Sequence, residues 1–136
     1  MEDGCKFRLF GVAAPEAAET FKAALFPATR PYVVDLVGKL GWGALGALIA
    51  RCALFLGNDT GAMHLAAAVQ TPCVAIFAAR NKPRVWFPYG KQHRVLYHQT
   101  DCWGCGLETC IVERKKCLTS ITVDEVVTEV RAILGE

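Results

Sequence analysis

The stretch that decides the fold of this chain is Gly57-Asn58-Asp59-Thr60-Gly61-Ala62-Met63-His64-Leu65-Ala66-Ala67-Ala68. It reads as the end of an apolar strand at 53–57, a polar turn, and an almost wholly apolar helix at 61–69. Thr60 and Asp59 are both residue types that cap helices, and either could cap this one. A buried strand leading directly into a buried helix is typical of parallel sheets covered by helices. The stretch therefore predicts an α/β fold with a polar turn at the carboxyl end of a strand.

The same turn predicts an anion site. The first N–H groups of a helix lack partners within the helix and carry partial positive charge, so the amides of Gly61, Ala62 and Met63 suit a phosphate. Gly61 also lets the phosphate approach the backbone. Asp59 is placed to accept hydrogen bonds from sugar hydroxyls, and His64 lies one turn on, on the same face as Thr60. Taken singly, these residues read as a helix cap and a core histidine, but together they favour a ligand site.

Strand-like and helix-like segments alternate along the whole chain. Strands are expected over 6–11, 32–36, 53–57, 73–77 and 94–97, and helices over 15–25, 43–51, 61–69 and 122–134. In the last helix, Thr122 and Glu125 match a capping box. The strands lack polar alternation, which indicates a parallel sheet covered on both faces. We expect one Rossmann-like three-layer domain over 1–136, with a cysteine-rich loop at 101–117.

Composition excludes several classes of protein. The chain has 136 residues, 53% hydrophobic and 21% charged, which is typical of a compact domain rather than a disordered chain. A formal net charge of +2 without a basic block predicts no nucleic-acid partner. Apolar stretches are interrupted by polar residues, and the N-terminus lacks a signal-peptide pattern. We therefore expect a cytoplasmic protein whose cysteines are not paired in disulfides.

Three motifs resemble glycosyltransferase family 9, the ADP-heptose:lipopolysaccharide heptosyltransferases and their relatives. They are NDTGAMHLAAA at 58–68, TPCVAIF at 71–77 and PYG at 88–90. The similarity extends over nearly the whole chain from Lys6 onward. It implies the C-terminal, donor-binding half of a two-domain GT-B enzyme that transfers heptose with inversion to the lipopolysaccharide core. It also implies that an N-terminal acceptor domain is missing and that the isolated chain is inactive. A cytoplasmic protein of this family would be peripheral at the inner face of the inner membrane.

The resemblance assigns roles to matching positions. Asp59 would bind the sugar hydroxyls, and the amides of Thr60, Gly61 and Ala62 would bind the diphosphate. His64 would contact the same phosphates. Leu40 and Gly41 would contact the adenine, and Glu16 would contact the ribose. No catalytic residue and no cofactor for transfer are expected in this chain. It departs from the family at 78–81, where Ala-Ala-Arg-Asn replaces a Gly-Pro-Thr-like turn.

Four cysteines lie within sixteen residues, as Cys102-x2-Cys105-x4-Cys110-x6-Cys117. Such density suits a structural zinc site, although the last gap is longer than in typical zinc knuckles. An iron–sulfur cluster is a less favoured metal site. Free thiols or an adventitious disulfide are the alternatives to a metal, and these interpretations stay open here. The other three, Cys5, Cys52 and Cys73, lie in or beside apolar segments and are expected to behave as small buried hydrophobic residues.

Two further functions compete. Gly41-Trp42-Gly43-Ala44-Leu45-Gly46 fits G-x-G-x-x-G, with Asp59 eighteen residues after the first glycine, which matches an NAD-binding oxidoreductase fingerprint. Against it, Trp42 would occupy the place where the pyrophosphate must approach. The other alternative is a non-catalytic, stand-alone binding module. For that module, the aromatic run Trp86, Phe87 and Tyr89 is either an exposed patch or packed over the sheet.

Overall fold

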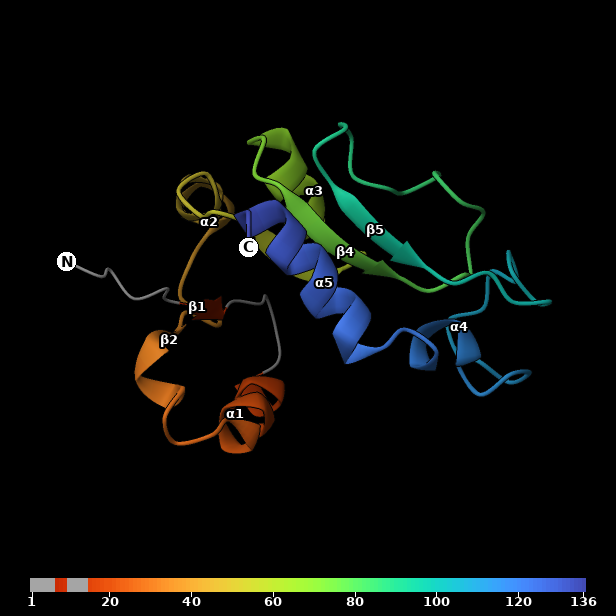
Figure 1. Cartoon of the computed structure of the whole chain (residues 1–136), viewed down its shortest axis with the longest axis horizontal. Helices are drawn as coiled ribbons and strands as arrows, with labels where there is room; N and C mark the ends of the chain where they lie inside the picture. The colour runs from red at the N-terminus through yellow and green to blue at the C-terminus, as the bar shows by residue number, and fades with distance from the viewer. Residues whose placement is uncertain (1–6, 10–14) are drawn as a thin grey trace. The chain divides into compact units, whose positions relative to one another are not determined.

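The computed structural model describes residues 7–9 and 15–136, and its secondary structure follows the expected order (Figure 1). Every expected strand and helix is present, with ends that agree within two residues wherever the ends are described. Lys6 and Gly11, at the ends of the first expected strand, lie outside the described residues, as does Cys5. The sequence analysis missed two short elements, the 3-10 helix η1 (Arg30–Tyr32) and α4 (Lys116–Thr119).

The chain divides into two compact units, Met1–Leu45 and Gly46–Glu136, with the boundary inside α2 (Trp42–Ile49). In the first unit, β1 (Phe7–Leu9) pairs in parallel with β2 (Val33–Asp35). The helix α1 (Pro15–Ala24) is tied to β2 by Lys22, whose Nζ donates to Asp35 Oδ2 at 2.7 Å. This hydrogen bond lowers the pKa of Asp35 below its ordinary value.

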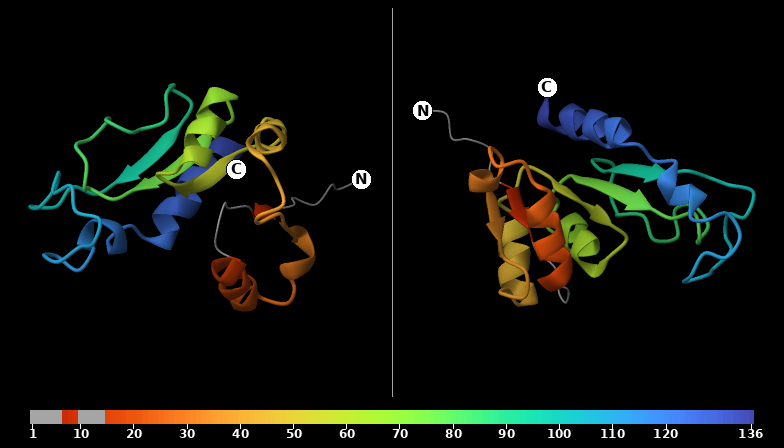
Figure 2. Two further views of the ribbon diagram at one scale, coloured as in Figure 1. Left: turned by 180° about the vertical axis from the view of Figure 1, so that it is seen from behind. Right: turned by 90° about the horizontal axis from the view of Figure 1, so that it is seen from below.

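The second unit holds a parallel sheet in the order β3-β4-β5, formed by β3 (Phe55–Asn58), β4 (Cys73–Phe77) and β5 (Arg94–Tyr97). The helix α3 (Gly61–Ala68) packs on β3 and β4, and α5 (Val123–Leu134) packs on β4. They cover opposite faces of the sheet, α5 above it and α3 below it in the right-hand view of Figure 2. This unit is therefore the helix–sheet–helix arrangement that the alternating pattern predicts.

The core of the second unit is centred on β4 and α3. Cys73, Val74 and Ala75 of β4 are fully buried, as is Met63 of α3. The buried Thr71 donates its hydroxyl to the carbonyl of Ile49 at 2.8 Å, which satisfies the one buried polar side chain of this core among the described residues. The start of α3 is thus held in place by side chains packed under the sheet.

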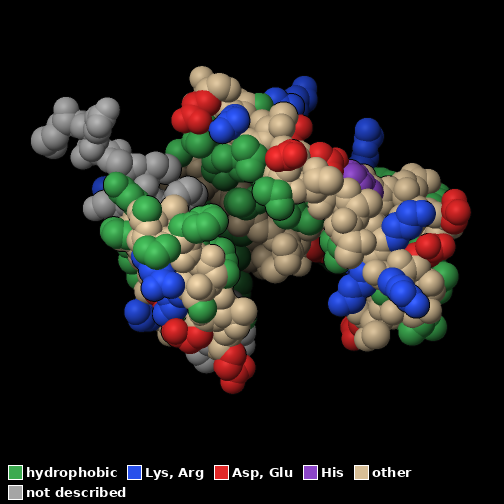
Figure 3. Space-filling model, turned by 60° about the horizontal axis from the view of Figure 1, so that its bottom comes forward, with side chains coloured by type: hydrophobic (Ala, Val, Ile, Leu, Met, Phe, Trp, Pro, Cys, Tyr) green, Lys and Arg blue, Asp and Glu red, His purple; other side chains and the backbone are tan. Residues whose placement is uncertain are grey.

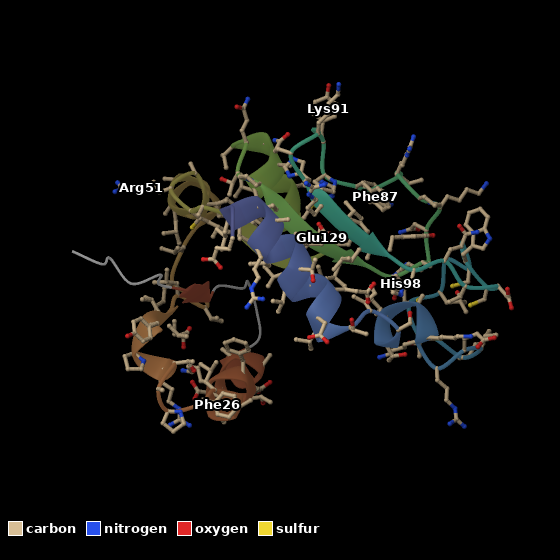
Figure 4. All side chains as sticks on the ribbon, viewed as in Figure 1. Phe26, Arg51, Phe87, Lys91, His98 and Glu129 are labelled. Atoms are coloured by element: carbon tan, nitrogen blue, oxygen red, sulfur yellow. The ribbon has the colours of Figure 1, made fainter. Side chains whose placement is uncertain are left out.

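The end of β5 is joined to the start of α5 through His98. Its Nε2 lies 2.8 Å from Glu125 Oε1, and its Nδ1 lies 2.9 Å from Ser120 Oγ. Figure 4 labels His98 beside the beginning of α5. Glu125 also closes the expected capping box, because its Oε2 accepts from the amide of Thr122 at 2.7 Å. The amide of Thr122 first, and His98 second, lower the pKa of Glu125.

We expect Met63→Ala to lower the free energy of unfolding by about 2–5 kcal/mol, because it removes a fully buried side chain and leaves a cavity beneath the sheet. Leu56→Ala is the control, since Leu56 on β3 is 50% exposed and its truncation should cost distinctly less. Chemical denaturation of both variants provides the measurement. Equal losses would contradict this description of the core.

We expect Glu125→Gln to destabilise the protein at neutral pH, because Gln still caps the helix but loses the charge that faces His98. Since the folded pKa of Glu125 is lowered, its carboxylate contributes stability above its unfolded pKa and loses it as the pH falls through the folded pKa. The difference from wild type should therefore shrink below about pH 4. Thermal unfolding across pH measures it. Asp124→Asn, in the same helical turn, is the control for the loss of one negative charge.

Candidate functional site

The turn from β3 into α3 leaves free two of the three backbone donors that the sequence predicts for an anion; the prediction is wrong for the amide of Met63, because the helix cap uses it. Thr60 is the N-cap of α3, with extended φ −146° and ψ 163°, and its Oγ1 accepts from the amide of Met63 at 3.4 Å. The amide of His64 is directed to the carbonyl of Thr60 at 3.3 Å. Within the described part of the chain, the amides of Gly61 and Ala62 donate to no protein group. An exposed helix start with two unused donors is suited to an anion.

Two ionisable side chains stand beside these donors. Asp59 precedes the cap, and its Oδ1 lies 3.9 Å from His64 Nε2. Both side chains are solvent-accessible, at 36% for Asp59 and 43% for His64. His64 is therefore not a core residue, the other interpretation of this position, because its ring lies at the surface one turn into α3. The turn therefore presents a carboxylate, an imidazole and two amides together.

The site lies where the strands of the second unit end. Asn58, the last residue of β3, is in register with Ile76 of β4, so the loop after Phe77 leaves the sheet beside the 58–61 turn. Gly57 is required near this end, because a Cβ there would lie 2.8 Å from Cε1 of the Phe55 ring. Ligands of open α/β sheets bind at this edge, beyond the carboxyl ends of the strands.

Sequence reasoning did not assign the tryptophan of the β4–β5 loop to this site. The ring centroid of Trp86 lies 6.3 Å from that of His64, with an interplanar angle of 70°. The sequence signal was the aromatic run 86–89, for which an exposed patch and packing over the sheet are the two interpretations. Each interpretation holds for different residues of the run. Phe87 packs over the sheet, 5.0 Å from Phe77, whereas Trp86 and Tyr89 are 52% and 94% exposed.

The other predicted ligand contacts belong to the first unit. Glu16 is exposed in the first turn of α1, Leu40 is half-buried, and Gly41 is exposed directly before α2. Their roles toward ribose and adenine stay predictions.

The structure gives the glycines of 41–46 a place that differs from a dinucleotide fingerprint. The strand β2 ends at Asp35, six residues before Gly41, and Gly43 and Gly46 lie inside α2. A Cβ on Gly46 would lie 3.4 Å from Leu65 Cδ1, so this glycine allows close packing of α2 on α3. In a dinucleotide-binding turn, the first glycines directly follow the strand and face the pyrophosphate. This geometry argues against the NAD-binding alternative.

The cysteine-rich loop is fastened to the end of β4. The amide of Gly104 donates to Ala79 O at 2.6 Å, and that of Gly106 to Arg80 O at 2.8 Å. Between them, Cys105 is exposed, whereas Cys102, Cys110 and Cys117 are half-buried. Across residues 7–9 and 15–136, no three His, Cys, Asp or Glu side chains are grouped to hold a metal ion. The four thiols as arranged do not form a zinc site, and zinc binding stays a prediction.

Two cysteines differ in the ionisation of their thiols. The sulfur of Cys110 accepts a hydrogen bond from the amide of Lys115 at 3.1 Å, and this bond, with further backbone amides, lowers the pKa of Cys110. Burial raises the pKa of Cys73 to about 11. Cys73 is thus the inert, buried residue that its apolar segment predicts, while Cys52 is half-buried.

We expect iodoacetamide to modify Cys110 of the native protein first among the half-buried cysteines and to leave Cys73 unmodified at neutral pH. The thiolate is the reacting form, so a lowered pKa speeds the reaction, and burial prevents it. Mass spectrometry of peptides after timed alkylation measures both rates. Protection of Cys110, together with about one equivalent of zinc in protein purified under reducing conditions, would instead support the metal interpretation.

No helix within the described ranges is long and apolar enough to cross a membrane. On the face drawn in Figure 3, Lys and Arg side chains are interspersed with Asp and Glu rather than gathered in one basic patch.

The fold and the turn define a Rossmann-like α/β protein of the kind that binds ligands beyond its strand ends. The family model "Glycosyltransferase family 9 (heptosyltransferase)" matches residues 1–116, and the chain belongs to this family. Lipooligosaccharide heptosyltransferase 2 of Haemophilus influenzae is 39% identical over 75 residues, which are 54% of this chain and 22% of that protein. Its counterpart from Campylobacter jejuni is 31% identical over 103 residues, 75% of this chain and 32% of that protein.

Solved structures agree with this membership. The structure of Escherichia coli ADP-heptose LPS heptosyltransferase II superposes with a TM-score of 0.77 and 29% identity, over 98% of this chain and 37% of that one. A family 9 glycosyltransferase from Veillonella parvula, 22% identical with a TM-score of 0.74 over 95% of this chain and 36% of that one, shares the fold. The chain spans between about a fifth and two fifths of the length of these relatives.

Proposed function

We propose that this chain binds the nucleotide-sugar donor, ADP-heptose, of a heptosyltransferase of lipopolysaccharide core biosynthesis. The observation that carries the proposal is the exposed start of α3, where the amides of Gly61 and Ala62 are free beside Asp59 and His64. A diphosphate fits two helix-start donors, and a carboxylate fits the hydroxyls of a sugar. Membership in the heptosyltransferase family supports the nature of the donor.

In transfer, the acceptor hydroxyl attacks the anomeric carbon as the diphosphate departs. Negative charge grows on the departing diphosphate, and the amides of Gly61 and Ala62 are oriented to stabilise it. His64, at the edge of the same turn, is placed to contact that phosphate from the side of the helix. The base that deprotonates the acceptor is assigned to no residue of this chain.

The whole protein therefore requires parts beyond this chain. We propose an acceptor-binding domain that binds the lipopolysaccharide core and supplies the base, so that the 136 residues alone bind donor without transferring sugar. The proposal includes work on the cytoplasmic side, at the inner face of the inner membrane, where a lipid-linked acceptor would be met. Glu16, Leu40 and Gly41 would contribute ribose and adenine contacts from the first unit.

The decisive experiment removes one amide without removing the helix. We expect Gly61→Pro to weaken ADP and ADP-heptose binding alike by about 1.5–3 kcal/mol, roughly 10- to 150-fold in Kd, because it deletes a donor to a charged group. Proline is well tolerated at the first helical position, and the extended Thr60 suits a residue before proline. Gly61→Ala, which keeps the N–H, is the matched control. Isothermal titration gives the affinities.

A second variant separates sugar from diphosphate. Asp59→Ala should weaken ADP-heptose and leave ADP nearly unchanged, with the exposed Asp101→Ala as its control. If wild-type protein binds neither ligand, or if Gly61→Pro binds both as wild type does, the donor-site proposal is wrong. Binding of NADH in place of both ligands would favour the oxidoreductase alternative.

A further inference from the structure

The loop between β4 and β5 is held firmly over the sheet by one aromatic residue. The ring of Phe87 lies 5.0 Å from Phe77 and 5.7 Å from Tyr97, in edge-to-face geometry at 64° and 66°. The hydroxyl of Tyr97 donates to Asn81 O at 2.8 Å, which ties the first part of the loop to the same strand. Figure 4 shows Phe87 beside β5. The loop therefore has a defined position, and its neighbouring side chains have defined directions.

Trp86 directly precedes this anchor in the β4–β5 loop. Its indole meets the imidazole of His64 at 6.3 Å and 70°, yet the residue stays 52% exposed. His64 in turn lies 3.9 Å from the Asp59 carboxylate. About half of this large aromatic residue is thus open to solvent, next to the imidazole of His64.

We propose that the indole of Trp86 binds the sugar ring of the donor by stacking on its C–H face, while Asp59 binds the hydroxyls at the ring edge. This inference rests on the proposed donor site. A sugar ring has apolar C–H faces and a polar rim, which match an aromatic plane beside a carboxylate. The indole face carries the negative part of its quadrupole, so it disfavours the diphosphate and leaves that group to the amides of Gly61 and Ala62.

The positions of these residues support separate places for the phosphates and the sugar ring. The amides that suit the diphosphate lie at the first two positions of α3, whereas His64, whose ring neighbours that of Trp86, is the fourth residue of the helix. In the proposed binding mode, the phosphates occupy the helix start and the neutral ring attached to them contacts Trp86. Trp86 would select a ring with an unobstructed C–H face, which makes it a residue that determines sugar specificity.

The test compares ADP-heptose with ADP. Trp86→Ala should weaken ADP-heptose roughly tenfold, as loss of a stacking partner does, and change ADP affinity by less than about twofold. Trp86→Phe should restore much of the loss because it keeps an aromatic plane. Tyr89→Ala, on the same loop and 94% exposed, is the control and should bind both ligands as wild type does. Thermal unfolding establishes that each variant folds.

Fluorescence gives an independent reading. In Trp42→Phe/Trp103→Phe protein, Trp86 is the sole tryptophan, and ADP-heptose should change its emission more than ADP does. Equal losses of ADP and ADP-heptose in Trp86→Ala, or no loss, would overturn the stacking role while Gly61→Pro still tests the anion site. Failure of wild-type protein to bind either ligand would overturn both proposals together.

Discussion

The cap in which the amide of Met63 donates to Thr60 O at 3.1 Å and to Thr60 Oγ1 at 3.4 Å is the interaction on which the site depends. It ends β3 and begins α3 within two residues, so that the helix start faces outward at the strand ends. The cap uses the third amide of the helix and leaves the first two free. The buried side chain of Met63 fastens the same turn to the sheet. A core residue and the two free donors are thus neighbours in sequence within one short segment.

Two loops are held in defined positions relative to the end of β4. One loop is anchored by Phe87 and presents Trp86 to His64, and the cysteine-rich loop is fastened to Ala79 and Arg80 by backbone hydrogen bonds. The segment 78–81 is also where the chain departs from the turn that the family resemblance implies.

The cysteine-rich loop shows where spacing alone stops being informative. Four cysteines in sixteen residues are compatible with zinc, but ligation requires the sulfurs to converge, and in the described chain they do not. Backbone amides instead gather around the sulfur of Cys110. The direction of each Cβ depends on the backbone of the loop, including positive φ at Gly104, Gly106, Arg114 and Lys115, and no spacing rule specifies those angles.

The sequence by itself determined the order of the main strands and helices, a capped helix start at Asp59 or Thr60, the capping box at Thr122 and the free amides of Gly61 and Ala62, although it wrongly added the amide of Met63. These features depend on neighbours a few residues apart, so local patterns suffice to predict them. The contact of Trp86 with His64, the role of Phe87 as an anchor and the packing of Gly46 on Leu65 were decided only by the tertiary structure. Such contacts join residues far apart in the chain, and they arise only when the helices pack on the sheet and bring those residues together.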